Sequence, residues 1–219
     1  MRSVDYTKNT YHEARHAELI ENEALQIAWS ECSKQFYFGG LPSGSDIFEF
    51  GGALGYNLIA LAKSNKCHML ELSEIGRSSA AKFGIISHFA IEEVFGKQFD
   101  VILCRHVLEH VDSPLQILEI LRPMLKPGGR LVLVLPIEKS TAAPVAKEID
   151  FHLFTWNPRT ICNLLKRAGY SEIDYRLQFF NGRRLCLPLY RLFGANAYAK
   201  AVELVGTLTR SRELVIVCR

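Results

Sequence analysis

The sequence predicts an α/β fold in which a doubly wound, mostly parallel sheet carries helices on both faces. Short apolar runs alternate along the chain with helix-like segments, which is the pattern of successive βαβ units. Two runs, VILC at 101–104 and LVLVL at 131–135, are continuously apolar, as strands covered on both faces are. Glycine and proline breakers such as KPGG at 126–129 separate the segments.

The size and composition of the chain are those of one compact domain. It has 219 residues, of which 48% are hydrophobic and 22% charged, enough to bury a sizeable core without metals or disulfides. Its 26 Lys and Arg residues against 23 Asp and Glu residues leave a formal charge of +3. A dedicated nucleic-acid binder usually carries a clustered basic surface, so this near balance argues against a nucleic-acid partner.

The cysteines and the apolar runs indicate the compartment. The six cysteines show no C-x-x-C spacing, and several stand in apolar runs, where a reduced and buried thiol is the ordinary interpretation. They are Cys32, Cys67, Cys104, Cys162, Cys186 and Cys218. The N-terminus shows no apolar leader segment, and no apolar run approaches the roughly 20 residues that span a bilayer. We therefore expect a cytoplasmic protein without an integral membrane segment.

The first predicted element is a helix over residues 9–30. Ala17, Ile20, Ala24 and Ile27 fall on one face at helical spacing, and Thr10 with Glu13 forms a capping box at its start.

Six apolar runs are predicted strands, at residues 47–50, 68–72, 99–104, 130–136, 172–180 and 213–218. A further helix is predicted from Pro158, because Asn157 can cap its start and Gly169 can end it.

The stretch DIFEFGGALGYN, residues 46–57, is predicted to form a strand, a glycine-rich turn and the start of a helix. Such a turn lies at the carboxyl edge of the sheet, where unpaired helix N–H groups bind ligands. The dinucleotide pattern G-x-G-x-x-G fails, since Ala53 and Tyr56 stand at its second and third glycines. The pattern E-x-G-x-G-x-G matches with one substitution, and its acid, Glu49, suits a ligand with an ammonium group better than a pyrophosphate.

Five motifs in order give the chain a family resemblance over about residues 40–175. They are FEFGGALGYN (48–57), HMLELS (68–73), FDVILCRHVLEHVDSP (99–114), LRPMLKPGGRLVLVLP (121–136) and HLFTWNPRTICNLLKRAGY (152–170). Together they resemble the class I S-adenosylmethionine-dependent methyltransferases, in their small-molecule branch. The resemblance implies a Rossmann-like, seven-stranded, mostly parallel sheet with an antiparallel last strand. It also implies S-adenosylmethionine as cofactor, S-adenosylhomocysteine as product, and in-line SN2 methyl transfer to a small-molecule acceptor.

The resemblance also implies a set of cofactor-binding residues, in which Glu71 bonds the ribose hydroxyls. They are Glu49, Gly51, Gly52, Ala53, Gly55, Asn57, Glu71, Leu72, Cys104 and Arg105. We expect Ala53 to be tolerated in place of a glycine if its φ is negative. The adenine contact should come from residues 86–95, where Ala90 and His88 are alternatives, and neither is assigned.

Three histidines near strand ends are candidates for a catalytic base: His106, His110 and His152. For each, a structural hydrogen bond is the alternative. Arg105 could contact an acidic acceptor or face solvent. No metal site is expected.

We expect a single domain over residues 1–219, with a helical lid (1–40), a cofactor-binding core (41–180) and a variable insertion before the last strand (181–212). Tyr6 and Tyr11 of the lid could lie near the cofactor. The insertion is basic and contains aromatic residues. It could cover an anionic, sugar-linked or lipid-linked acceptor, form a peripheral membrane surface, or simply pack on the sheet with a solvated basic face. The oligomeric state is left open.

Two other functions stay open. Ala53 and the unclear 86–95 motif suggest a catalytically inactive S-adenosyl-ligand-binding protein or partner subunit. A nicotinamide-dependent dehydrogenase is a more distant alternative.

Overall fold

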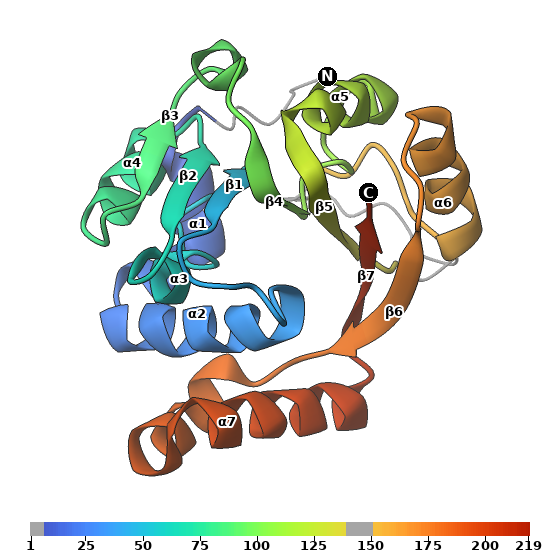
Figure 1. Cartoon of the computed structure of the whole chain (residues 1–219). Helices are drawn as coiled ribbons and strands as arrows, with labels where there is room; N and C mark the ends of the chain where they lie inside the picture. The colour runs from blue at the N-terminus through green and yellow to red at the C-terminus, as the bar shows by residue number, and fades with distance from the viewer. Residues whose placement is uncertain (1–6, 139–150) are drawn as a thin grey trace.

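A seven-stranded sheet forms the centre of the chain in the computed structural model, which describes residues 7–138 and 151–219 (Figure 1). The strand order is β3-β2-β1-β4-β5-β7-β6. The strands are β1 (Asp46–Phe50), β2 (Lys66–Leu70), β3 (Ile86–His88), β4 (Phe99–Arg105), β5 (Leu125–Pro136), β6 (Asp174–Phe179) and β7 (Arg212–Cys218). β1 to β5 pair in parallel, whereas β7 is antiparallel to both β5 and β6. The predicted mostly parallel, seven-stranded sheet with an antiparallel last strand is therefore confirmed.

Helices cover both faces of this sheet (Figure 1). They are α1 (Asn9–Ile20), α2 (Glu23–Tyr37), α3 (Ile59–Ala62), α4 (Glu74–Ala81), α5 (Pro114–Leu121), α6 (Pro158–Arg167) and α7 (Arg183–Thr209). Successive side chains of β4 point to opposite faces of the sheet, so they belong to two separate hydrophobic cores. Val101 and Leu103 belong to the core that holds α2, α3 and α7, whereas Ile102 and Cys104 belong to the core that holds α5 and α6.

The predicted single helix over residues 9–30 is wrong, because the chain breaks between α1 and α2. The side chain of Asn22 accepts a hydrogen bond from Leu25 N at 3.0 Å and caps α2. A short polar side chain that bonds the backbone locally competes with helix continuation. The predicted capping box is wrong as well, because α1 begins at Asn9 and Thr10 already lies inside it.

The predicted start and end of α6 are confirmed. Asn157 is the N-cap and accepts a hydrogen bond from Thr160 N, and Pro158 occupies the first helical position. Gly169 follows the helix with φ of +88°, a conformation that favours glycine.

The six cysteines are all free thiols, and five of them are buried. Among residues 7–138 and 151–219, no helix is both long and apolar enough to cross a membrane.

Candidate functional site

The glycine-rich turn after β1 approaches β2 and the loop after β4 closely. The backbone N–H groups of Gly51 and Gly52 both donate to Leu70 O, at 3.0 and 2.9 Å. Gly51 has φ of +79°, and a Cβ built on it would stand 2.4 Å from Val107 Cγ2. Only glycine satisfies both the backbone and the space at this position.

A cavity of about 400 Å³ lies beside this turn, between the carboxyl ends of the strands and the N-terminal helix α1. Its volume is within the range of roughly 300–1,000 Å³ that small-molecule sites occupy. Of the residues predicted from sequence, those that line it are Gly51, Ala53, Asn57, Glu71, Leu72, Arg105, His106, His110 and His152. Glu49, Gly52, Gly55 and Cys104 do not line it.

Helix α1 closes one side of the cavity with four residues, of which only Tyr11 was expected from the sequence to lie near the cofactor. Tyr11, His12, Arg15 and His16 all line it, whereas Tyr6 lies outside the described residues. His16 has non-helical backbone angles, so α1 bends there. Burial, followed by the charge of His12, lowers the pKa of His16 to about 3, so this ring is neutral at physiological pH.

Glu71 directly follows β2, and its carboxylate is engaged by three groups of the protein. Ala53 N donates to Oε2 and Ser73 N to Oε1, both at 2.8 Å. His12 Nε2 lies 3.3 Å from Oε1. The carboxylate therefore ties the glycine-rich turn, the start of α4 and helix α1 together at the cavity wall.

Ala53 is left-handed, with φ of +47°, so the condition of a negative φ, under which an alanine would be tolerated there without strain, is not met. Its N–H must point at Glu71 to make the bond just described. The left-handed conformation costs about 1–2 kcal/mol for a residue with a Cβ. This strained position lies on the cavity wall.

Glu49 is fully buried below the turn. Asn57 Nδ2 donates to its Oε1 at 2.6 Å, and its Oε2 accepts no hydrogen bond from any described residue. Burial raises the pKa of Glu49 to about 8, although the Asn57 hydrogen bond opposes the shift. A buried carboxylate oxygen without a partner suits a cation at the neighbouring turn.

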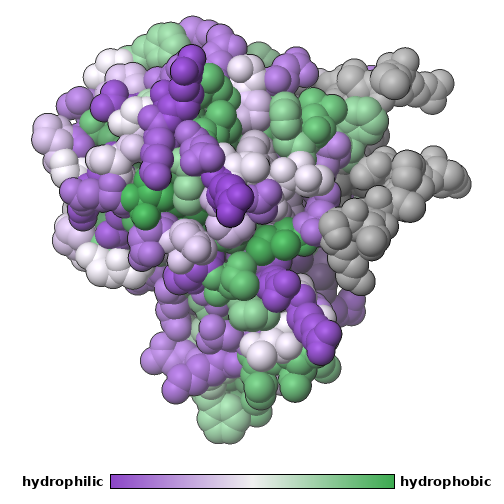
Figure 2. Space-filling view, turned by 90° about the vertical axis from the view of Figure 1, so that its right-hand side faces the viewer, coloured by the Kyte–Doolittle hydropathy of each residue, from purple (hydrophilic) through white to green (hydrophobic). Residues whose placement is uncertain are grey.

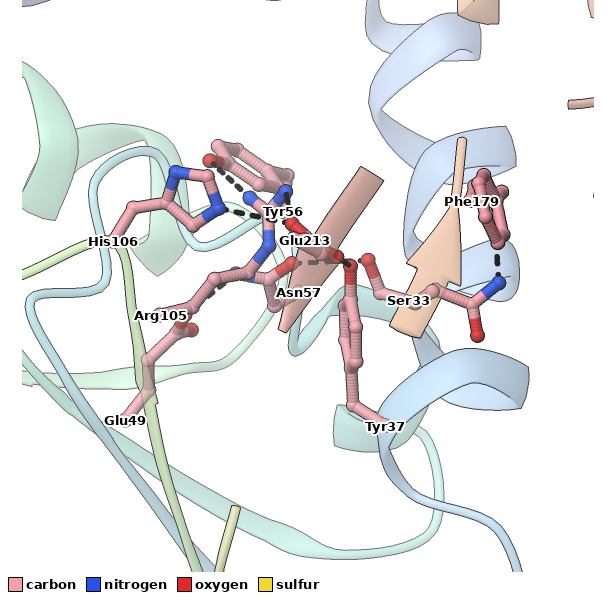
Figure 3. A network of polar contacts seen from close by, with 10 residues as sticks. Ser33, Tyr37, Glu49, Tyr56, Asn57, Arg105, His106, Phe179 and Glu213 are labelled. Carbon is pink, nitrogen blue, oxygen red and sulfur yellow. Dashed lines mark hydrogen bonds and ion pairs between the residues drawn. The ribbon is translucent and has the colours of Figure 1, made fainter. Parts of the chain in front are cut away.

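A network of buried polar side chains joins β4 to the last strand (Figure 3). Glu213, in β7, receives Arg105 Nη2 at 3.1 Å and lies 2.9 Å from His106 Nε2 through Oε2. Tyr37 of α2 donates its hydroxyl to Oε1 of the same carboxylate. His106 directly follows β4 and is left-handed, with φ of +54°.

The charges of this network set the protonation of His106. Burial alone would raise the pKa of Glu213, but Arg105 and the His106 hydrogen bond lower it below its ordinary value. Burial and then the Arg105 guanidinium lower the pKa of His106, against the effect of Glu213. An ionised carboxylate only accepts, so neutral His106 donates through Nε2 and keeps its Nδ1 lone pair.

Arg105 is buried and held inside the protein. Besides Glu213, it donates to Tyr56 Oη at 3.3 Å, and its guanidinium lies 5.6–5.7 Å from the ring centres of Trp29, Tyr37 and Phe180. It reaches the cavity wall but does not face solvent, which excludes one of the two alternatives predicted for it.

His110 and His152 form a second group on the cavity wall. Their ring centres lie 4.8 Å apart, and His152 Nδ1 bonds Glu138. The ligand atoms of Glu109, His110 and His152 lie within 4.8 Å of one another, close enough to share one cation. No metal site was expected from the sequence, in which Glu109 had not been singled out.

The adenine contact stays unassigned. Within the described residues, none from 86–95 lines the cavity. His88 instead stacks on His68, with 3.0 Å between the ring nitrogens, and lies 3.3 Å from Glu93.

Sequence reasoning missed Glu213 and His12. Glu213 is 107 residues away from His106, and its only signal was an acid at the start of the apolar run LVIVC, where it is costly unless paired. His12 carried no signal, because α1 reaches Glu71 only through the tertiary fold.

Known proteins resemble this chain over most of its length. A family model described as a methyltransferase domain matches residues 26–174. A ubiquinone biosynthesis O-methyltransferase of Xylella fastidiosa (strain M23) is 34% identical over 145 residues, which are 61% of this chain and 55% of the relative. The chain thus spans about half the length of this curated relative, and 40% of the one from Roseobacter denitrificans.

Two solved structures share the fold at low identity. The complex of the Haloferax volcanii Trm112 methyltransferase activator with a methyltransferase aligns with a TM-score of 0.62 and 14% identity, covering 99% of this chain and 98% of that one. The Haemonchus contortus phosphoethanolamine N-methyltransferase 2, bound to S-adenosylhomocysteine, aligns with a TM-score of 0.57 and 16% identity, covering 90% of this chain and 52% of that one.

The family match covers strands β1 to β5, the glycine-rich turn and the cavity residues between Phe50 and His152, whereas helix α1, strand β7, helix α7 and nearly all of β6 lie outside it. The chain therefore belongs to the methyltransferase domain family.

Proposed function

We propose that the protein transfers a methyl group to a hydroxyl of an anionic small molecule, with His106 as the base and Glu213 as the residue that positions it. The observation that carries the proposal is the His106–Glu213 pair, 2.9 Å apart, on the wall of the cavity that Glu71 and the glycine-rich turn also line.

The residues around the turn suit S-adenosylmethionine. Glu71, on the cavity wall, offers a carboxylate to the ribose hydroxyls. Asn57 lines the cavity and bonds Oε1 of the buried Glu49, whose Oε2 has no hydrogen-bond partner among the described residues. We propose that Glu49, through Asn57 or directly, neutralises the ammonium group. Gly51 and Leu72 border the proposed cofactor site. Gly52 and Gly55 do not line the cavity, but they let the turn pack closely against Met69 and Ala80. Bound there, S-adenosylmethionine supplies a methyl group that its sulfonium charge already activates for in-line displacement.

His106 would remove the proton of the acceptor hydroxyl. Its Nε2–H is held by Glu213, so Nδ1 is the nitrogen that can take up the proton. The lowered pKa of His106 keeps the ring neutral at physiological pH, and the carboxylate of Glu213 stabilises the imidazolium that forms. His110 and His152 stay second candidates, because both line the same cavity.

Two observations support an anionic acceptor with an oxygen nucleophile. Arg15, Arg105 and Arg183 all line the cavity, so its wall carries three guanidinium groups that can attract an anionic acceptor. The curated relatives named above carry the name of O-methyltransferases. We infer that α1 acts as the lid over this site, since four of its residues line the cavity. The free cysteines support the cytoplasm as the place of action.

The test is formation of S-adenosylhomocysteine from S-adenosylmethionine with a panel of hydroxylated aromatic acids, polyprenyl phenols and sugar phosphates. His106→Asn is the decisive variant, because asparagine tolerates the left-handed backbone at this position. We expect turnover to fall by about 10²–10⁴-fold while calorimetric affinity for S-adenosylmethionine is kept. His110→Asn and His152→Asn serve as comparators, and a larger loss in either would transfer the role of base to it.

Two observations favour a second candidate, a non-catalytic S-adenosyl-ligand-binding protein. Ala53 is strained on the cavity wall, and Glu71 already has three protein partners, including His12 of α1. Tight S-adenosylmethionine binding without turnover across the whole panel would support this candidate and contradict the first. A saturable change of NADH fluorescence on mixing would contradict both.

A further inference from the structure

Helix α7 presents large apolar side chains to solvent. It bends at Gly194, where φ is +78°, into two segments. Leu185, Leu192, Phe193, Leu204 and Leu208 are between 60% and 75% exposed. In the first segment, Leu185, Leu189 and Leu192 recur at helical spacing and share one face, and in the second Leu204 and Leu208 do the same. Each segment is therefore apolar on an outer face as well as on its packed face.

The inner face of α7 is already used. Cys186, Leu187, Tyr198 and Val202 are buried in the core shared with α2. Figure 1 shows α7 lying beyond α2, at the lower end of the molecule. Packing against the body of the protein thus accounts for one side of α7 and leaves the outer leucines unexplained. The alternative expected from the sequence, a packed helix with a solvated basic face, does not account for these exposed leucines.

The same segment carries a net positive charge that exceeds the net charge of the whole chain. Residues 183–210 include Arg183, Arg184, Arg191, Lys200 and Arg210 against Glu203 alone, five positive charges minus one negative, a net charge of +4. The whole chain has +3, so the remainder carries a net charge of 3 − 4 = −1. Arg184 and Arg191, seven residues apart, border the exposed leucine face of the first segment, and Lys200 precedes Leu204 by one helical turn.

Apolar and hydrophilic residues lie together at this end of the surface. Figure 2 shows strongly apolar and strongly hydrophilic residues side by side at the lower end of the molecule, which α7 forms in Figure 1. A helix with leucines and a phenylalanine on its outer face, bordered by basic residues, has the composition of an element that lies in a membrane interface.

We propose that the outer face of α7 docks the protein on an anionic lipid bilayer, with the exposed leucines and Phe193 entering the acyl boundary and the basic side chains on the lipid phosphates. The positive charge of the segment favours an anionic bilayer over a second copy of the chain as the partner of this face. In a symmetric dimer the same patch meets itself, so the basic residues Arg184, Arg191 and Lys200 would meet an identical basic patch in which Glu203 is the one acid. A bilayer surface with negative headgroups supplies the missing charge.

The docking face is continuous with the methyl-transfer site. Arg183, in the first turn of α7, and Phe180, just before it, both line the cavity. A docked α7 would therefore hold the cavity close to the membrane surface, where an acceptor with an apolar tail is concentrated. This last point rests on the proposed function, whereas the docking itself does not.

The experiment is co-sedimentation of the full chain with vesicles of phosphatidylcholine and phosphatidylglycerol in equal parts, and with phosphatidylcholine alone. We expect binding to the anionic vesicles that weakens as salt is raised. Leu185→Ser combined with Leu192→Ser should weaken that binding at least roughly tenfold, because two apolar side chains that would be buried in the bilayer are lost. Arg184→Gln combined with Arg191→Gln should weaken it and reduce its salt dependence.

The matched control is Phe95→Ser, which removes a 55% exposed aromatic side chain outside α7. It should leave vesicle binding unchanged. All the altered residues are exposed, so circular dichroism should report unaltered folding. Absence of binding to anionic vesicles, or binding that the leucine variants leave intact, would overturn the proposal. A dimer in analytical ultracentrifugation that the leucine variants dissociate would overturn it too, by assigning the face to a second copy. None of these readouts depends on methyl transfer, so failure here and failure of the proposed function are distinguishable.

Discussion

Glu213 and His106 lie 2.9 Å apart, carboxylate to Nε2, although 107 residues separate them in sequence. The last strand, β7, brings this acid beside the end of β4 because β5 pairs with both strands. Arg105 shares the same carboxylate at 3.1 Å. Glu213 thus holds the His106 ring in a fixed orientation, and Arg105 neutralises the Glu213 carboxylate. This arrangement suits a base, which must stay unprotonated until it reacts.

Replacing Glu213 by glutamine should reduce turnover at least about tenfold and alter its pH dependence. The carboxylate raises the pKa of His106, so its loss should lower that pKa further. The base is active when deprotonated, so the acid limb of the pH–rate profile should move to lower pH while the plateau drops. Two-dimensional ¹⁵N NMR of the imidazole in the cofactor-bound protein would show whether Nε2 loses its fixed proton.

Tyr37→Phe is the control for this change, since it removes a hydrogen bond to the same carboxylate but leaves the charge in place. A profile that falls uniformly, without any shift, in Glu213→Gln would show that Glu213 has only a structural role. If Glu213→Gln fails to fold because Arg105 loses its partner, the imidazole spectrum of the wild type alone still decides the tautomer.

Replacing Glu71 by alanine should weaken S-adenosylmethionine binding by about 1–3 kcal/mol, the value of hydrogen bonds to a charged group. Part of the loss would come from the turn, because Ala53 N and Ser73 N lose their acceptor. Isothermal calorimetry would measure it. Glu74→Ala, an exposed acid three residues on, is the control and should bind normally. Unchanged affinity in Glu71→Ala would remove the ribose assignment.

Replacing Glu49 by glutamine should stabilise the free protein while weakening cofactor binding. The folded state raises the pKa of Glu49 from 4.5 to about 8, so it holds this proton more tightly than the unfolded chain does. The free energy of unfolding of the wild type therefore falls, as far as this group is concerned, when pH rises through that window. Urea unfolding at several pH values should show the advantage of Glu49→Gln growing toward pH 8.

The same group predicts a pH dependence of binding. An ammonium ligand favours the ionised carboxylate, so binding should release a proton and strengthen as pH rises toward 8. Calorimetry in buffers of different ionisation enthalpy counts the proton. Equal proton release by the wild type and by Glu49→Gln would assign the effect to another residue.

Replacing Ala53 by glycine should stabilise the protein by about 0.5–1 kcal/mol. Glycine removes the left-handed penalty at φ of +47° and loses part of that gain through its more flexible unfolded state. Chemical denaturation would measure the change. Ala201→Gly, inside α7, should have the opposite sign and cost about 1 kcal/mol. A destabilised Ala53→Gly protein would mean that the alanine methyl contributes packing that outweighs the strain.

The sequence by itself determined six of the seven strands and the glycine-rich turn, whereas the place of Glu71 followed from the family resemblance. Continuous apolar runs such as 131–135 report burial on both faces, and the helix α6 carries its start and end signals in Asn157 and Gly169. These features follow from local preferences and from burial, which act over a few residues. β3 escaped prediction because only three residues form it, too few to show a period. The break at Asn22 escaped because its side chain bonds the backbone, which a pattern of apolar residues does not reveal.

The tertiary structure alone decided what surrounds the site. His12 meets Glu71, and Glu213 meets His106, because helix α1 and strand β7 are placed by packing against distant parts of the chain. The sign of φ at Ala53 depends on the bond between its N–H and Glu71, 18 residues away. The exposure of Leu185 and Leu208 on α7 likewise depends on which helix face α2 already covers. Long-range contacts of this kind carry no periodicity in sequence, so only the folded chain shows them.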